Sequence, residues 1–208
     1  MATARFGPDR AIGRSGLRVG LLGGSFNPAH DGHLHISRLA LARLGLDQVW
    51  WLVSPQNPLK PAAGMAPLAD RLASARRVAA AERHIQVGDL ETGFGTRYSA
   101  DTIRALKRCY PQTHFIWLMG ADNLQQFPRW RDWTSIFEAV PIAVFDRDTY
   151  SFAALAGKAA KRFASGRIGP RKARRLAMTP PPAWVYFHIP RHPASATEIR
   201  ARNERGKA

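Results

Sequence analysis

The sequence is poor in cysteine, in long apolar runs and in acidic residues. Cys109 is the only cysteine among 208 residues, so no disulfide can form within the chain, and we expect a reducing compartment, the cytoplasm. No apolar stretch approaches the roughly 20 residues that span a bilayer. The first residues are basic and contain no apolar core of the kind that a secretory signal has. We therefore expect no membrane partner.

The scarcity of acidic residues leaves a large positive charge. Fifteen aspartates and glutamates stand against 31 lysines and arginines, a formal net charge of +16. Such a surplus predicts anionic partners: nucleotides, polyphosphates or nucleic acid. Residues 158–175, here called the basic segment, contain eight lysines or arginines and no acid. We interpret this segment first as a solvated face, with an RNA-contacting patch as the alternative.

Apolar runs alternate with amphipathic stretches along the chain. Strands are predicted over residues 17–24, 47–54, 84–90, 113–120, 140–147 and 183–189. Helices are predicted over 31–46, 69–83 and 98–110 and from about residue 195, with loops at 55–68 and 91–97. This alternation predicts an α/β fold: a Rossmann-like parallel sheet with helices on both faces, in a single domain. We expect that domain to cover residues 17–208, behind a basic N-terminal arm of residues 1–16.

The loop after the first predicted strand combines glycines with paired histidines. Parallel sheets bind ligands where the strands' carboxyl ends meet helix N-termini. Gly23 and Gly24 have no Cβ, so a ligand can approach their backbone closely. His30 and His33 share one face of the first helical turn, and imidazoles beside helix N–H groups suit a phosphate. His35 lies outside this pattern and is assigned a structural role.

Zinc ligation is the alternative interpretation of His30 and His33. It is disfavoured because no cysteine or acidic pair completes a tetrahedral set. We therefore expect no metal held by protein ligands.

A second polar segment, "SATEIR" at residues 195–200, lies near the C-terminus. Ser195 followed by Glu198 forms a capping box, which by itself would explain both residues. Thr197 and the first N–H groups of this helix would face an anion. Arg200 supports that interpretation, because a cation near a helix N-terminus is unfavourable unless an anion lies between them.

The two segments resemble the signatures of the nucleotidyltransferase superfamily. "GGSFNPAHDGH" is similar to its H-x-G-H signature, and "SATEIR" is similar to S-x-T-x-x-R, although Ala194 and Ala196 depart from the commonest pattern. Within the superfamily, residues 17 to 203 resemble the bacterial nicotinate-nucleotide adenylyltransferases. The further matching segments are "PQNPLKP" (55–61), "YSADT" (98–102), "GADN" (120–123) and "FPRW" (127–130).

The resemblance implies a reaction and a set of site residues. The enzymes of this family transfer AMP from ATP to nicotinate mononucleotide, giving nicotinate adenine dinucleotide and pyrophosphate in NAD biosynthesis, and Mg²⁺ would arrive with ATP. The catalytic residues would be His30, His33 and Arg200. The ATP site would comprise Gly23, Gly24, Ser25, Phe26, His30, His33, Asp122, Ser195, Thr197 and Arg200, with Asp122 on a ribose. The mononucleotide site would comprise Asn27, Lys60, Ser99, Ala100, Trp130 and Arg131.

In that acceptor site Trp130 would stack on the pyridine ring. The Ser99 and Ala100 backbone and the Arg131 N–H would meet its carboxylate, and the neighbouring Trp133 is equally well explained as core. ATP and nicotinate mononucleotide are the expected partners, nucleic acid is not, and assembly of identical copies stays open. Three alternatives also stay open: a nicotinamide mononucleotide acceptor, a phosphopantetheine acceptor, or a non-catalytic RNA-binding protein.

Overall fold

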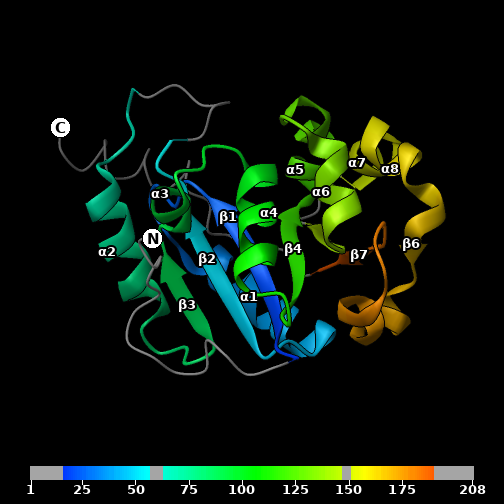
Figure 1. The fold of residues 1–208 in the computed structure, drawn as a ribbon, viewed down its shortest axis with the longest axis horizontal. Helices are drawn as coiled ribbons and strands as arrows, with labels where there is room; N and C mark the ends of the chain where they lie inside the picture. The colour runs from blue at the N-terminus through cyan, green and yellow to red at the C-terminus, as the bar shows by residue number, and fades with distance from the viewer. Residues whose placement is uncertain (1–15, 57–62, 147–150, 190–208) are drawn as a thin grey trace.

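The computed structural model describes residues 16–56, 63–146 and 151–189, which form one seven-stranded sheet (Figure 1). The strand order is β3-β2-β1-β4-β5-β7-β6, and every recorded strand pair is parallel. The strands are β1 (Arg18–Gly24), β2 (Gln48–Val53), β3 (Ile85–Gly88), β4 (His114–Gly120), β5 (Ile142–Asp146), β6 (Arg167–Ile168) and β7 (Trp184–His188).

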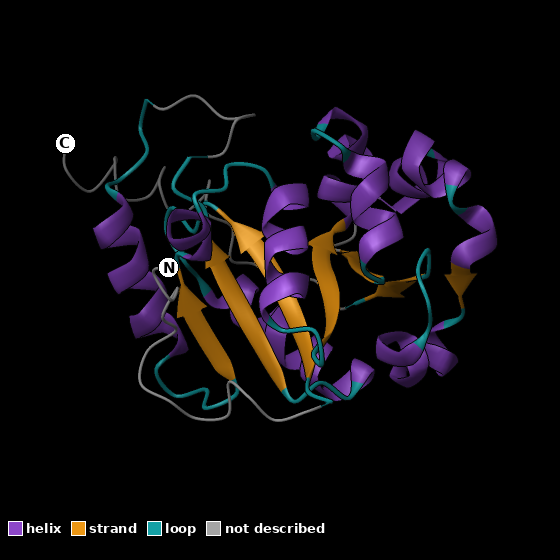
Figure 2. Ribbon diagram, in the orientation of Figure 1, coloured by secondary structure: helices purple, strands orange, loops and turns teal. Residues whose placement is uncertain are grey.

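Helices cover both faces of this sheet (Figure 2). One face packs against α1 (Asp31–Leu44), α2 (Leu68–Ala79) and the 3-10 helix η3 (Pro170–Met178). The other packs against α3 (Leu90–Phe94), α4 (Ser99–Cys109), α5 (Ala121–Gln126), α6 (Trp133–Ala139), α7 (Ser151–Ala156) and α8 (Lys158–Arg162). Two short 3-10 helices, η1 (Phe127–Arg129) and η2 (Ala164–Gly166), complete the described elements.

Burial on both faces explains why the strands are continuous apolar runs in the sequence. In β2, all six residues of "QVWWLV" are buried. Trp50 and Leu52 pack on the α4 side, whereas Val49, Trp51 and Val53 pack on the α1 side. The predicted α/β sheet with helices on both faces is confirmed.

Two local predictions differ from the structure. The segment expected as a loop after β3 contains α3, because Leu90 and Glu91 are buried there and Gly95, with a φ of 64°, ends the helix. The basic segment contains α8, η2, β6 and part of η3, and the two-residue β6 was not predicted because so short an edge strand has no apolar pattern. The N-terminal arm (residues 1–16) and the helix expected from about residue 195 fall almost wholly outside the described residues, so both remain predictions.

The order of the strands places the ligand crevice. From β1 the chain builds β2 and β3 on one side, and it then returns to add β4 and β5 on the other. The carboxyl ends of β1 and β4 therefore flank a topological switch point, where sheets of this kind bind ligands. No helix in the described part of the chain has the length and apolar character needed to cross a bilayer.

Candidate active site

The predicted site residues that the structure describes gather around the carboxyl ends of β1 and β4. Gly23 and Gly24 end β1, and Asp122 is half-buried in the first turn of α5, directly after β4. These segments adjoin in the sheet, because β1 and β4 are paired neighbours. Lys60, Ser195, Thr197 and Arg200 lie outside the described residues, and their contacts remain predictions.

The two glycines at the end of β1 have different surroundings, which explain differently why each position lacks a side chain. A Cβ on Gly23 would lie 2.6 Å from the Trp117 ring, so this glycine is required by the packing of β1 against a β4 side chain. A Cβ on Gly24 would make only ordinary contact, 3.5 Å from the Phe26 ring. The sequence interpretation gave both glycines one reason, close approach of a ligand. For Gly23 the structure provides a packing reason instead.

Phe26 fixes the turn between β1 and α1. Its φ of 46° lies in the left-handed region, which bulky side chains rarely adopt. The ring is 2% exposed and stacks on Trp51 at a centroid distance of 5.1 Å. Trp51 is held in turn, because its Nε1 donates to Ser37 Oγ at 2.8 Å. The unusual backbone of Phe26 is thus held by a buried aromatic contact.

His30 and His33 cap the start of α1 with their rings. His30 is the N-cap residue, and its Nδ1 accepts the Gly32 N–H at 3.1 Å. His33 Nδ1 accepts the His30 N–H at 3.2 Å, which completes a capping box made of imidazoles. The two ring centroids are 4.0 Å apart. Because each Nδ1 is an acceptor, the proton of each neutral ring is on Nε2.

The sequence did not predict that the two histidine rings cap the helix. Their spacing predicted a shared helix face, but it did not show that the Nδ1 atoms would cap the helix. The capping role and an anion-binding role are compatible, since they use opposite nitrogens of each ring. Within the described residues, no group of three or more His, Cys, Asp or Glu side chains could hold a metal ion. The expectation that the protein itself holds no metal remains a prediction.

The start of α4 forms the acceptor side of the site. Its N-cap, Tyr98, makes no side-chain capping bond, so the N–H groups around Ser99 and Ala100 are not capped by that side chain. The Arg131 guanidinium lies 4.6 Å from the centre of the Tyr98 ring. The structure therefore brings the Arg131 side chain to Tyr98, the residue before Ser99, and the carboxylate contacts assigned to Ser99, Ala100 and the Arg131 N–H remain predictions.

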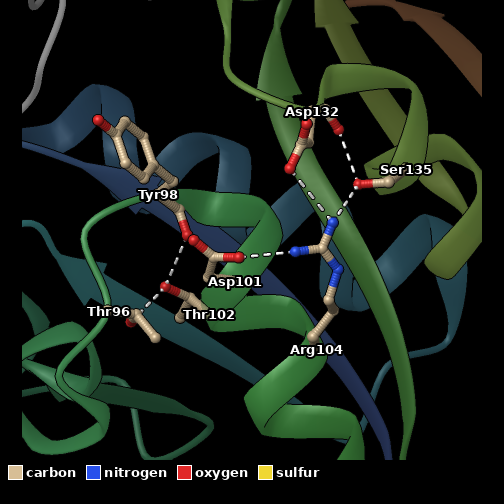
Figure 3. Close-up of polar contacts among 7 residues, drawn as sticks. All are labelled: Thr96, Tyr98, Asp101, Thr102, Arg104, Asp132 and Ser135. Atoms are coloured by element: carbon tan, nitrogen blue, oxygen red, sulfur yellow. Dashed lines mark hydrogen bonds and ion pairs between the residues drawn. The ribbon is translucent and has the colours of Figure 1, made fainter.

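Arg104 connects α4 to the segment that carries Arg131 (Figure 3). Its guanidinium donates to Asp101 at 2.6 Å, to Asp132 at 3.4 Å and to Ser135 at 3.1 Å. Asp132 has a φ of 50°, so the chain turns sharply just after Arg131. Exposed ion pairs contribute little stability singly, but this set fixes how the two segments meet.

Trp130 and Trp133 lie on the same face of the sheet, at the border of its core. Trp130 is half-buried and packs edge-on against Phe127 at 5.0 Å and Trp117 at 6.2 Å. Trp133 is half-buried as well and packs edge-on against Phe127, Phe137 and Phe163 at centroid distances of 6.3, 6.4 and 5.8 Å. Burial therefore does not separate the two rings: the choice for Trp133 stays open, and the stacking role of Trp130 remains a prediction.

The Asn27 side chain is used by the protein itself. Its Nδ2 donates to Gly64 O at 3.0 Å, and its Oδ1 accepts the Ala66 N–H at 3.3 Å. Asn27 thus holds the segment before α2 against the turn after β1. The predicted contact between Asn27 and a mononucleotide remains a prediction.

Two buried charged residues beside the site were not identified from the sequence. Glu91 accepts a hydrogen bond from Ser54 Oγ at 2.8 Å, and burial raises the pKa of its carboxyl. Arg71, 2% exposed, lies on α2 and donates to four backbone carbonyls. A signal for Arg71 was present: it lies four and eight residues before the buried Ala75 and Ala79, on the apolar face of its helix.

Comparisons with known proteins identify the family and the fold of this chain. The family model described as cytidylyltransferase-like matches residues 21–202. A "Probable nicotinate-nucleotide adenylyltransferase" of Methylorubrum extorquens is 52% identical over 186 residues, covering 89% of this chain and 100% of the relative. A relative of the same name in Cereibacter sphaeroides is 51% identical over 191 residues, covering 91% and 98%.

Among solved structures, Plasmodium falciparum nicotinic acid mononucleotide adenylyltransferase complexed with NaAD has a similar fold. The TM-score is 0.66, at 15% identity, over 89% of this chain and 83% of that one. The same protein complexed with APC gives a TM-score of 0.64, at 14% identity.

Proposed function

This chain belongs to the cytidylyltransferase-like family, and we propose that it transfers AMP from ATP to nicotinate mononucleotide, forming nicotinate adenine dinucleotide and pyrophosphate in NAD biosynthesis. The observation that carries the proposal is the agreement between two findings. Relatives named for this activity are about half identical over nearly the whole chain. At the switch point of the sheet, the His30 and His33 rings cap the N-terminus of α1 through their Nδ1 atoms, which places the proton of each neutral ring on Nε2.

The chemistry requires two anions to meet. An oxygen of the mononucleotide phosphate forms a bond to the α-phosphorus of ATP, while the bond from that phosphorus to the bridging oxygen of the pyrophosphate breaks. No side-chain nucleophile is needed, so catalysis depends on positioning and on stabilising the charge of the leaving group. ATP enters as its Mg²⁺ chelate. This suits a site whose described donors are imidazoles and N–H groups rather than a cluster of carboxylates.

The residues divide into a donor side and an acceptor side. On the donor side, His30 and His33 together with the Gly24–Phe26 backbone bind the ATP phosphates, and Asp122 accepts hydrogen bonds from a ribose. Ser195, Thr197 and Arg200 would contact the far phosphates, by resemblance. Gly23, the remaining residue assigned to the ATP site, contributes indirectly, because its lack of a Cβ allows β1 to pack closely against Trp117.

On the acceptor side, the nicotinate carboxylate lies at the start of α4, whose N-cap residue Tyr98 makes no side-chain capping bond. Ser99, Ala100 and the Arg131 backbone donate to it, and Trp130 covers the pyridine ring. Asn27 and Lys60 complete this set by resemblance. Donors at this corner favour a carboxylate over an amide, because the amide NH₂ would face other donors.

A coupled assay tests the proposal directly. The protein is incubated with Mg²⁺, ATP and either nicotinate or nicotinamide mononucleotide, and both pyrophosphate and the dinucleotide are measured. We expect turnover with nicotinate mononucleotide and at most slow turnover with the amide. Equal turnover of the two would overturn the acceptor assignment, and turnover of neither would overturn the proposed reaction.

A further inference from the structure

Arg71 is the only buried lysine or arginine in the part of the chain that the structure describes. All four of its recorded hydrogen bonds go to backbone carbonyls. Nε donates to Ala66 O at 2.9 Å, Nη1 to Ser25 O and Ser54 O at 2.7 Å each, and Nη2 to Pro55 O at 2.8 Å. Because guanidinium has five N–H donors in one plane, this arrangement uses nearly all of its donor capacity.

These carbonyls belong to three segments around the site. Ser25 is in the turn between β1 and α1, Ser54 and Pro55 follow β2, and Ala66 precedes α2. Ser54 is also tied to the turn directly, because its N–H donates to Gly24 O at 2.9 Å. One planar side chain therefore sets how the proposed phosphate-binding turn sits against its two neighbouring segments.

The contact with Ser25 has a direct consequence for the turn. In a trans peptide the C=O and N–H groups point in opposite directions. Since the Ser25 carbonyl faces Arg71, the Phe26 N–H faces away from it. We propose that Arg71 is a positioning residue that orients the Phe26 N–H, and with it the Ser25–Phe26 backbone, for the ATP phosphates. This inference rests on the proposed adenylyl transfer.

The charge of Arg71 acts in the same direction. Its recorded partners are neutral carbonyls, and no carboxylate among the described residues pairs with it. Burial lowers the pKa of the Arg71 guanidinium, but an arginine remains protonated at neutral pH. A buried positive charge behind the turn favours anions in front of it, because the protein interior screens less than water.

The experiment must separate positioning from a purely structural role. Arg71→Lys keeps the charge but lacks the planar fork, Arg71→Met removes both, and Arg71→Ala leaves a space that free guanidinium can enter. Arg76→Met is the matched control, since Arg76 is an exposed arginine on the same helix. For each variant, kcat, the KM values, the affinity for a non-hydrolysable ATP analogue and the thermal unfolding midpoint are measured.

We expect kcat/KM for ATP to fall roughly a hundredfold in Arg71→Lys, as for a small misplacement of reacting groups, with analogue affinity also reduced. Arg76→Met should match the wild type. Millimolar guanidinium should restore part of the rate of Arg71→Ala and none of that of His33→Ala. Should Arg71→Ala not fold, Arg71→Lys and Arg71→Met decide the question by their kinetics and analogue affinity.

Two results would overturn the inference. One is wild-type kcat/KM and analogue affinity in both Arg71→Lys and Arg71→Met. The other is an Arg71→Ala variant whose thermal unfolding midpoint rises on addition of guanidinium while its kcat does not. Failure of the proposed function gives a different result, because the wild-type protein would then show no adenylyl transfer. Loss of analogue binding in the Arg71 variants would still show that Arg71 positions the Ser25–Phe26 backbone.

Discussion

Replacing His33 by alanine and by glutamine should separate the two roles of its ring. Nδ1 accepts the His30 N–H and completes the cap of α1, while Nε2 carries the proton that we assign to the ATP phosphates. Glutamine closes capping boxes at this position of a helix, so it can restore the cap but supplies no imidazole. Alanine removes both functions.

The structure gives the expected size of each effect. Loss of a cap costs about 1 kcal/mol. Loss of the aromatic contacts of the ring, 4.6 Å from Phe26 and 5.8 Å from Trp51, costs about 0.5–1.5 kcal/mol each. His33→Ala should therefore lower the free energy of unfolding by about 2–4 kcal/mol. Its kcat should fall at least about a hundredfold, which corresponds to about 2.7 kcal/mol and is the usual effect of losing one preorganised donor.

Two quantities are measured for each variant: kcat, from pyrophosphate release at saturating substrates, and the free energy of unfolding, from urea denaturation. His33→Gln should recover the stability of the cap but not kcat. His35→Ala, two residues further along α1, should keep the wild-type kcat. The reasoning is refuted if His33→Ala retains the wild-type kcat, or if glutamine restores kcat together with stability, because the ring would then act only as a cap.

Three further predictions concern the acceptor, the basic segment and a buried acid. Trp130→Ala should raise KM for nicotinate mononucleotide roughly five- to hundredfold, by loss of stacking, and leave KM for ATP nearly unchanged; equal damage to both substrates would contradict the stacking role. Charge reversal at Arg171, Lys172 and Arg174 should leave kcat unchanged while weakening any RNA binding and its salt dependence; a large fall in kcat would contradict this. Burial raises the pKa of Glu91 above its ordinary 4.5, so as pH rises above about 4.5 the unfolded state loses this proton first and stability falls until the raised pKa is passed. The free energy of unfolding of Glu91→Gln, measured with urea, should not show this fall with pH. If the wild type and Glu91→Gln have the same pH profile, the prediction is contradicted.

The location of η3 explains why its charges should not affect catalysis. Arg167 pairs with Trp184, the first residue of β7, so β6 begins at the amino ends of the strands. The residues that follow η3 line a cavity of about 210 Å³ together with His114 and Phe115, at the start of β4. In Figure 1 the arrowheads of β1 to β4 point to the top of the view, whereas η3, in orange, lies at the lower right. Arg171, Lys172 and Arg174 are exposed there, away from the carboxyl ends that hold the site.

Much of the fold was predictable because both faces of the sheet are buried. A strand such as β2 then has no polar face, and its apolar run stands out between helices with helical periodicity. The place of His30 and His33 followed from the same pattern, since a loop after the first strand of such a sheet leads to the ligand crevice. Local sequence and overall fold agree here.

The details of the site were less predictable because they depend on contacts between distant parts of the chain. The capping use of the Nδ1 atoms depends on ring orientation, which residue spacing does not determine. Arg71 meets Ser25, which is 46 residues away in the sequence. Neither contact could be predicted from one segment alone, although a cation on the apolar face of α2 was a sign that this face had a polar partner.

Packing also connects the two halves of the proposed site. The Trp117 ring occupies the space that a Cβ on Gly23 would need, and the same ring packs edge-on against Trp130. Protein interiors are close-packed, so a shift of one ring is passed to its neighbours. The absence of a side chain at Gly23 therefore sets the position of Trp117 and, through it, the position of the ring that we assign to the pyridine. On this argument Gly23, which sequence patterns assign to the nucleotide, serves the geometry of the acceptor at least as much.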